Sequence, residues 1–184
     1  MTDVGASPKR VLCLCGSLRR ESANRAALEA ARELAPASLR LELYSGMGEL
    51  LLFSPDAEVD PLPPAVLDLR EAVGRADALL IACPEYAHGV PGAFKNALDW
   101  LVGSLEFPGK PVALINASGR GSHHAQEALA EILRTMSATV LDDVSGTVPL
   151  PGVGCEPAWI VEQPDLREVL CALLARLDRA LAQA

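Results

Sequence analysis

Four side chains able to bind phosphate follow the first apolar run of the chain. The run "VLCLC" (residues 11–15) leads into "GSLRRESAN", which places Ser17, Arg19, Ser22 and Asn24 in one short loop. Hydroxyl and amide groups donate hydrogen bonds, and a guanidinium offers a charged fork that matches phosphate oxygens. A helix that begins near Ser22 would add free backbone N–H groups and the positive end of its dipole. The loop therefore predicts a phosphate-monoester site, with the alternative that Ser22 only caps a helix while the arginines are solvated.

A second chemistry fits the same loop, because Cys13 and Arg19 have the C-x5-R spacing of low-molecular-weight tyrosine phosphatases. In that chemistry a thiolate attacks phosphorus while the arginine and backbone N–H groups hold the oxygens. Cys13, however, lies inside the apolar run, and Arg20 stands where Ser or Thr is expected. Two better-known nucleotide loops are excluded, because no G-x-G-x-x-G follows the first strand and G-K-[ST] does not occur. A phosphatase that uses Cys13 therefore stays the weaker interpretation.

A second segment, "CPEYAHGVPGAFKNALDWL" (residues 83–101), follows the third apolar run. Pro91 suits the first position of a helix, and the apolar residues after it recur at helical spacing. In the loop before that helix, Pro84 restricts the backbone, Gly89 frees it and Tyr86 offers an aromatic ring. The loop is suited to present main-chain groups to a flat ligand, and the alternative for Tyr86 and His88 is ordinary loop surface.

Both loops need a scaffold, and the apolar runs around them indicate a parallel sheet covered by helices. The runs "RVLCLC", "LRLEL", "ALLIAC" and "PVALINA" alternate with amphipathic stretches such as residues 23–34 and 166–177. The second run alternates apolar and charged residues, as an edge strand does, whereas the others are continuously apolar. This favours the order 2-1-3-4-5, with a fifth strand near residues 139–141. We therefore predict a three-layer α/β/α sandwich of the flavodoxin-like class with a five-stranded parallel sheet.

Length and composition set further expectations. The 184 residues predict a single domain over residues 9–184, preceded by a flexible tail of residues 1–8. Loops are expected at residues 54–64 and 148–164. The net charge of -8 disfavours a nucleic-acid partner, and no stretch approaches the ~20 apolar residues of a membrane span. The five cysteines lack metal-ligand spacing and are expected to be reduced and mostly structural. We expect a soluble, cytoplasmic protein without a bound metal.

The two motifs together resemble those of the NADPH-dependent FMN reductase family. The family patterns read G-S-x-R-x-x-S-x-N and P-E-Y-N-x-S-x-P-G-x-L-K-N-A-I-D-W, beside "GSLRRESAN" and "PEYAHGVPGAFKNALDW" in this chain. The resemblance covers about residues 9–135. It implies FMN as cofactor and NADPH or NADH as reductant. The acceptor it implies is a quinone, an azo compound, a metal oxyanion or free flavin.

The resemblance also implies a set of flavin-binding residues. For the FMN phosphate they are Ser17, Arg19, Ser22 and Asn24. Along the flavin ring and ribityl chain they are Pro84, Glu85, Tyr86, Ala87 and His88. At the pyrimidine end they are Ser118 and Gly119. No catalytic residue is implied, because the hydride chemistry belongs to the flavin.

The chain departs from the family pattern at two positions of the second motif. Ala87 stands where the family usually has Asn, and Gly89 where it often has Ser. Two polar contacts to the flavin are therefore expected to be missing or supplied by His88 or by the backbone, which would alter flavin affinity or acceptor choice. His123 and His124 are expected near the fourth-strand loop, either meeting the nicotinamide phosphate or the acceptor or solvated at a helix start.

A non-enzymatic electron carrier that binds FMN is the main alternative. Flavodoxin carriers usually take the phosphate in a loop rich in Ser, Thr and Gly without an arginine, and they lack the P-E-Y segment, which disfavours this alternative. The resemblance further implies a homodimer or homotetramer. The residues alone do not identify the physiological acceptor or a preference between NADPH and NADH.

Overall fold

The computed structural model describes residues 7–119, 121–152 and 154–183, so residues 1–6 of the predicted tail lie outside the described part. The strands are β1 (Lys9–Cys15), β2 (Leu39–Leu43), β3 (Ala78–Ala82), β4 (Pro111–Asn116), β5 (Thr139–Val140) and β6 (Gly146–Thr147). The helices are α1 (Ala23–Glu33), α2 (Pro64–Arg75), α3 (Gly92–Val102), α4 (His123–Thr135), α5 (Pro157–Glu162) and α6 (Pro164–Ala182), with 3-10 turns η1 (Gly46–Glu49) and η2 (Pro55–Ala57).

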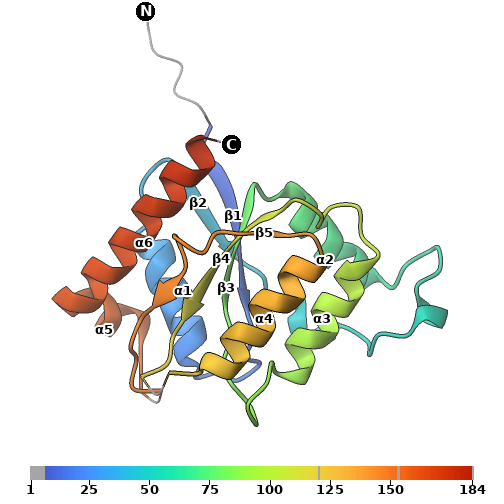
Figure 1. Cartoon of the computed structure of the whole chain (residues 1–184), viewed down its shortest axis with the longest axis horizontal. Coiled ribbons are helices and arrows are strands. Elements are labelled where there is room, and N and C mark those ends of the chain that lie inside the picture. Colours follow the sequence, from blue (N-terminus) through green and yellow to red (C-terminus); the bar gives the residue numbers. More distant parts are fainter. Residues whose placement is uncertain (1–6, 120, 153, 184) are drawn as a thin grey trace, which may run out of the picture.

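The strands form one parallel sheet in the order β2-β1-β3-β4-β5, with β6 paired to β4. The predicted strand order is therefore confirmed, and β2 lies at the edge as its alternating pattern indicates. Strand β1 is central, with Cys15 opposite Ala82 of β3. The carboxyl ends of β1, β3 and β4 consequently meet at one edge of the sheet, where the loops that follow them come together (Figure 1).

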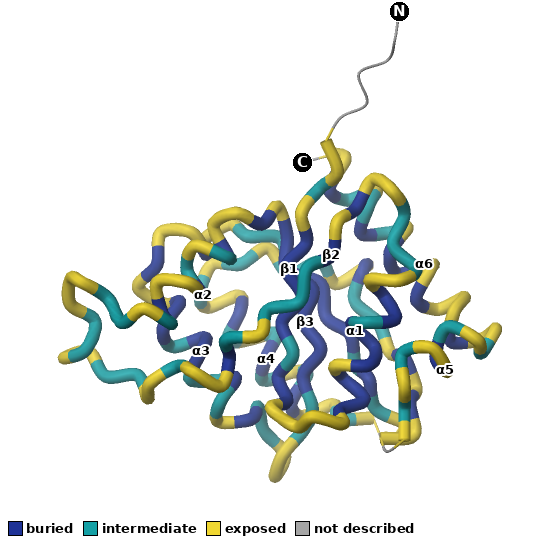
Figure 2. Tube along the Cα trace, turned by 180° about the vertical axis from the view of Figure 1, so that it is seen from behind, coloured by how far each residue is buried: buried dark blue, intermediate teal, exposed yellow. Residues whose placement is uncertain are grey.

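Helices cover both faces of the sheet, which gives the three predicted layers (Figure 1). Successive residues of a strand point to opposite faces. Cys13 and Leu80 belong to the core under α1 and α6, whereas Leu14 and Ile81 belong to the core under α2, α3 and α4. Figure 2 shows the central strands buried between these two layers. Within the described residues, no helix combines the length and the apolar character needed to cross a bilayer.

Two features of the fold were not expected from the sequence. The outer part of β4 pairs with the two-residue strand β6, so Ile115 lies opposite Gly146 and the sheet gains a sixth strand. The expected loop over residues 148–164 was wrong for residues 157–162, which form α5. Both elements are too short to show a hydrophobic period. Helix α5 is held by tertiary packing, because Ile160 is fully buried in the core beneath it.

Candidate cofactor site

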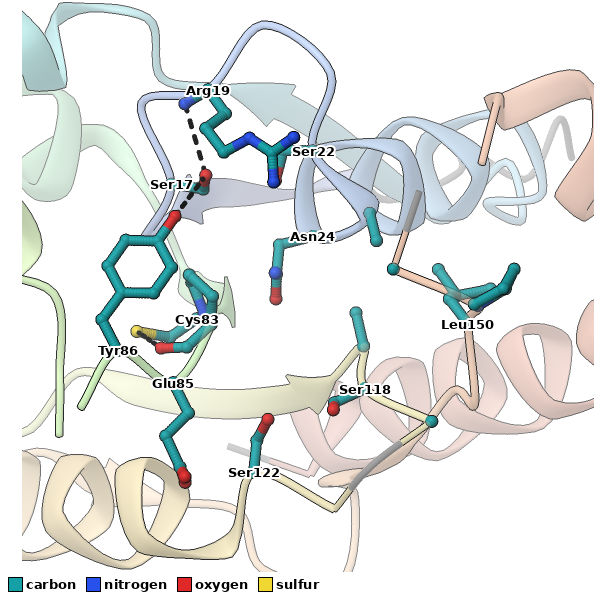
Figure 3. A pocket seen from close by; sticks show the side chains of 16 residues that line it. Ser17, Arg19, Ser22, Asn24, Cys83, Glu85, Tyr86, Ser118, Ser122 and Leu150 are labelled. Atoms are coloured by element: carbon teal, nitrogen blue, oxygen red, sulfur yellow. Dashed lines mark hydrogen bonds between the residues drawn. The ribbon is translucent and has the colours of Figure 1, made fainter. Parts of the chain in front are cut away.

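A cavity of about 670 Å³ opens at the carboxyl ends of the central strands (Figure 3). Its walls come from the loops after β1, β3 and β4 and from the segment after β6. The lining residues are Ser17, Arg19, Ser22, Ala23, Asn24, Cys83, Pro84, Glu85, Tyr86, Ala117, Ser118, Gly119, Ser122, Leu150, Pro151 and Gly152. Two sequence motifs that lie far apart in the chain therefore share one concave surface, as expected at a switch point of a parallel sheet.

The first loop packs against the end of β3 because Gly16 has no side chain. A Cβ at Gly16 would lie 2.6 Å from the Sγ of Cys83 and 3.0 Å from its Cα. The Gly16 N–H donates to the carbonyl of Ala82 over 2.9 Å, which fixes the loop to the neighbouring strand. The loop residues that follow therefore start from a defined position at the edge of the cavity.

Polar groups of this loop face the cavity. Ser22 is the N-cap of α1 and accepts a hydrogen bond from the Arg25 N–H over 3.4 Å. Its hydroxyl proton is not used in that bond, so capping and ligand binding are compatible. Ser17 Oγ accepts from the Arg19 N–H over 3.3 Å. The side chain of Arg19 is exposed and extends toward Ser22 (Figure 3).

Asn24 is the buried polar residue at the centre of this arrangement. Its side chain projects from the first turn of α1 into the cavity (Figure 3), although only 8% of the residue is exposed. Within the described residues, its Oδ1 atom is buried and has no hydrogen-bond partner. A buried acceptor without a donor costs about 1–3 kcal/mol, which a ligand carrying hydroxyl or amide donors would recover.

The loop after β3 closes in a tight turn. The N–H and carbonyl groups of Tyr86 and Gly89 bond to each other in both directions at 3.0 Å. The two residues between them, Ala87 and His88, have φ angles of 50° and 60°, as turns of type I′ require. This turn carries Ala87 and His88 away from the cavity wall. Of the predicted flavin-binding residues, these two do not line the cavity, whereas the others do.

The turn accounts for the Asn of the family pattern at this position, because Asn tolerates the left-handed region better than Ala, and Ala87 adopts that region here at an energetic cost. The Ala87→Asn and Ala87→Gly variants are expected to raise the free energy of unfolding by about 1 kcal/mol, measured by urea denaturation. Ala175, an exposed residue inside α6, is the control, and its replacement by Gly should lower stability by about 1 kcal/mol. Loss of stability in both Ala87 variants would contradict this account.

Glu85 connects the loop after β3 to the amino end of α4. One carboxylate oxygen accepts the Ala125 N–H over 3.0 Å, and the other lies 3.4 Å from Nδ1 of His88. The Ala125 N–H, supported by the nearby imidazoles, lowers the pKa of the Glu85 carboxyl. The side chain of Gln126 adds a hydrogen bond of 3.3 Å to the Cys83 carbonyl. Glu85 therefore lies at the cavity wall as a fixed anion, bonded to one helix start.

The opposite wall uses a segment that the motifs do not contain. The Gly119 N–H donates to the Leu150 carbonyl over 3.1 Å, and a Cβ at Gly119 would lie 3.0 Å from that oxygen. Leu150, Pro151 and Gly152 thereby join Ser118 at the cavity. Sequence reasoning missed this segment, because nothing in its composition signals a site. Cys83 and Ala117 were also missed, although their positions directly after β3 and β4 were a usable signal.

Cys13 is not available for phosphatase chemistry. It is fully buried inside β1, and burial raises the pKa of its thiol to about 12. A thiol with that pKa stays neutral near pH 7, whereas nucleophilic attack needs a thiolate. Burial likewise raises the pKa of Cys83 to about 12, although this residue lies in the cavity wall. Among the residues that the structure describes, no group of three or more His, Cys, Asp or Glu side chains is arranged to hold a metal ion.

Several known proteins resemble this chain in sequence. The quinone reductase of Pseudomonas putida is 41% identical over 125 residues, which are 62% of this chain and 66% of that protein. The NAD(P)H-dependent FMN reductase PA1204 of Pseudomonas aeruginosa is 43% identical over 128 residues, which are 67% of this chain and 69% of that protein. The chain thus spans about two thirds of the length of these relatives.

Solved structures and a family match complete the comparison. FerB, a flavoenzyme NAD(P)H:(acceptor) oxidoreductase from Paracoccus denitrificans, superimposes with a TM-score of 0.75 and 23% identity, covering 95% of this chain and 98% of that one. This similarity confirms the predicted fold. The NADPH-dependent FMN reductase family matches residues 9–149, which extends beyond the region of about 9–135 expected from the motifs. Because that match covers well over half of the sequence, the chain belongs to the NADPH-dependent FMN reductase family.

Proposed function

We propose that this protein is an FMN-dependent oxidoreductase that takes electrons from NADPH or NADH and passes them to a quinone. One observation carries the proposal: the loop after β1, which is predicted to bind phosphate, and the loop after β3 line a single cavity at the carboxyl ends of the strands. The relatives named quinone reductase support a quinone as acceptor. Azo compounds, metal oxyanions and free flavin stay candidate acceptors.

The residues of the cavity fit FMN. Ser17, Arg19 and Ser22 offer two hydroxyls and a guanidinium at one end, which suits a phosphate dianion beside the start of α1. Asn24 offers its amide beside them, and its unpaired Oδ1 suits a ligand rich in hydroxyl groups such as the ribityl chain. The Gly119 backbone packs closely against the Leu150 carbonyl, which fixes the far wall of the cavity.

When bound, FMN supplies the redox chemistry by accepting a hydride equivalent from the nicotinamide and returning two electrons to the acceptor. The main chain of Pro84, Glu85 and Tyr86 would lie along the ring and orient it. The apolar side chains of Ala117 and Leu150 would exclude water from one wall. Glu85 keeps its loop against α4 and is a positioning residue. We assign no side chain as a catalytic acid or base.

Anaerobic spectroscopy tests the function directly. Protein loaded with FMN and desalted is expected to retain a flavin absorbance band that bleaches when NADPH or NADH is added without oxygen. Addition of a quinone should then restore the band. A band that is retained but not bleached by either reductant would favour the electron carrier instead. A colourless protein after desalting would contradict the proposal as a whole.

We also propose that the protein is a cytoplasmic homodimer or homotetramer and a single domain over residues 9–184. Four exposed apolar residues, two at or just after the carboxyl end of α3 and two in the segment bonded to α3, support self-association. They are Leu51, Leu52, Val102 and Leu105, of which Leu105 is 94% exposed. The segment that carries Leu51 and Leu52 projects beside α2 and α3 (Figures 1 and 2). Within the described residues the five cysteines form no disulfide with one another, which fits a reducing compartment.

A further inference from the structure

All three histidines of the chain meet at one side of the cavity. His88 lies in the turn after β3, whereas His123 and His124 begin α4. The ring centroids of His88 and His124 are 4.6 Å apart, and those of His123 and His124 are 4.1 Å apart. We call His88, His123 and His124 the histidine cluster. Two segments that are distant in the sequence thus bring together every imidazole that the protein has.

The cluster lies outside the cavity but touches its wall. Glu85, which lines the cavity, places one oxygen 3.4 Å from Nδ1 of His88. Its other oxygen is bound by the Ala125 N–H, so both carboxylate oxygens are engaged. The side chain of His88 is 76% exposed, and His123 and His124 are also exposed. The cluster therefore presents imidazole groups to solvent at the rim.

The two ends of the cavity differ in the groups that they offer. Figure 3 shows Arg19 and Ser22 at one end and Glu85 and Ser122 at the other. The first end suits the phosphate of FMN, as argued above. A second nucleotide that enters over the flavin would place its own phosphates outside the cavity, at the rim. The histidine cluster lies at the rim next to Glu85.

Electrostatics favours a local cationic site for such a substrate. The chain carries a net charge of -8, which repels a polyanionic dinucleotide at long range. Imidazole gains a positive charge between about pH 5 and 8 and donates hydrogen bonds in both forms. The first turn of α4 adds the positive end of a helix dipole at His123 and His124. A phosphate dianion would meet several donors at this place.

We propose that the histidine cluster binds the 2′-phosphate of NADPH and so sets a preference for NADPH over NADH. This inference rests on the proposed function, because it assumes that the nicotinamide enters over bound FMN. The 2′-phosphate is a dianion at the end of the dinucleotide remote from the nicotinamide. The 2′-phosphate therefore fits an exposed group of donors at the rim better than the pyrophosphate does. Because NADPH and NADH share the pyrophosphate, only a contact to the 2′-phosphate distinguishes them.

Equilibrium binding to the FMN-loaded protein tests the assignment. Dissociation constants for NADP⁺ and NAD⁺ are measured in the same buffer at about pH 6. The His123→Gln/His124→Gln variant should weaken NADP⁺ binding about tenfold and change NAD⁺ binding by less than about twofold. His88→Gln should act in the same direction. Arg179, exposed in the last turn of α6, is the control, and Arg179→Gln should change neither constant.

Two binding results would overturn the assignment. Equal weakening of NADP⁺ and NAD⁺ would place the pyrophosphate, rather than the 2′-phosphate, at the cluster and overturn the assignment. Unchanged binding of both in the double variant would also overturn it. Titration of the FMN-free protein with adenosine 2′,5′-bisphosphate separates this inference from the proposed function. If the double variant binds adenosine 2′,5′-bisphosphate about tenfold more weakly than the wild type, the assignment is supported even if FMN is not retained. If the double variant binds it as tightly as the wild type, the assignment is contradicted.

Discussion

The Arg19→Gln variant is expected to bind FMN about 10- to 100-fold more weakly than the wild type. Arg19 brings the guanidinium to the end of the cavity proposed for the phosphate, beside the hydroxyls of Ser17 and Ser22. Hydrogen bonds to a charged partner contribute about 1.5–3 kcal/mol each, which corresponds to this range of affinity. Quenching of FMN fluorescence during titration with protein measures the dissociation constant. Because the side chain of Arg19 is exposed, the stability of the FMN-free protein should change by less than about 0.5 kcal/mol.

Arg20 is a matched control for this prediction. It is the next residue in the chain, carries the same charge and is also exposed, but it does not line the cavity. Arg20→Gln should change FMN affinity by less than about threefold, because only screened, long-range attraction is lost. Equal losses in both variants would mean that the arginines act through general charge. Unchanged affinity in Arg19→Gln would place the phosphate elsewhere.

The central part of the fold could be predicted because it follows from local patterns. Strands β1, β3 and β4 are buried on both faces and are continuously apolar, whereas β2 alternates, and this difference alone indicates its edge position. Strands β5 and β6 have two residues each, so neither can show a period, and of the two only β5 was predicted, near residues 139–141. Their pairing depends on the free edge of β4, which is a property of the folded sheet.

The candidate site likewise contains residues that local sequence could predict and residues that only the folded structure brings to the cavity. Ser17 and Asn24 could be placed because they lie in the loop after a strand of predictable position and in the first turn of the helix that follows it. Leu150 is held at the cavity by its buried side chain and by a backbone hydrogen bond to Gly119, contacts between distant segments that no local pattern encodes. Ala87 and His88 were assigned by motif position, but the type I′ turn directs them away from the cavity. The motif therefore identified a loop that lines the cavity, without fixing which of its residues face inward.

The second half of the second motif has a structural role that its sequence did not reveal. Asn96 and Trp100 both donate to the carbonyl of Leu51, over 2.8 and 2.7 Å. Asn96 also accepts the Phe53 N–H over 2.7 Å. The Trp100 carbonyl in turn accepts from Nε of Arg70 over 3.0 Å. Helix α3 thus holds the segment that carries the exposed apolar surface, while the first half of the motif forms the cavity.

Trp100→Ala is expected to lower the free energy of unfolding by about 3–5 kcal/mol, as for other large aromatic residues removed from a core. Trp100 is fully buried, and its ring meets that of Phe53 edge to face with centroids 5.1 Å apart. The substitution also removes the indole N–H, which is one of the two donors to the Leu51 carbonyl. Urea denaturation at one protein concentration measures the change. Sedimentation of the same samples should show a smaller assembly than the wild type, because the proposed interface loses its support.

The Trp100→Phe variant keeps an aromatic ring at this position but removes the N–H that donates to the Leu51 carbonyl. Asn96 still donates to the Leu51 carbonyl, so the oxygen keeps a partner and the loss should be only about 1–2 kcal/mol. Trp159, the second tryptophan of the chain, is 39% exposed, and Trp159→Ala should cost about 1 kcal/mol or less. If Trp100→Ala destabilised the protein no more than Trp159→Ala, Trp100 would not be the anchor of this segment. If Trp100→Ala lost stability but kept the wild-type assembly, the apolar surface at Leu51 and Leu52 would not be the interface.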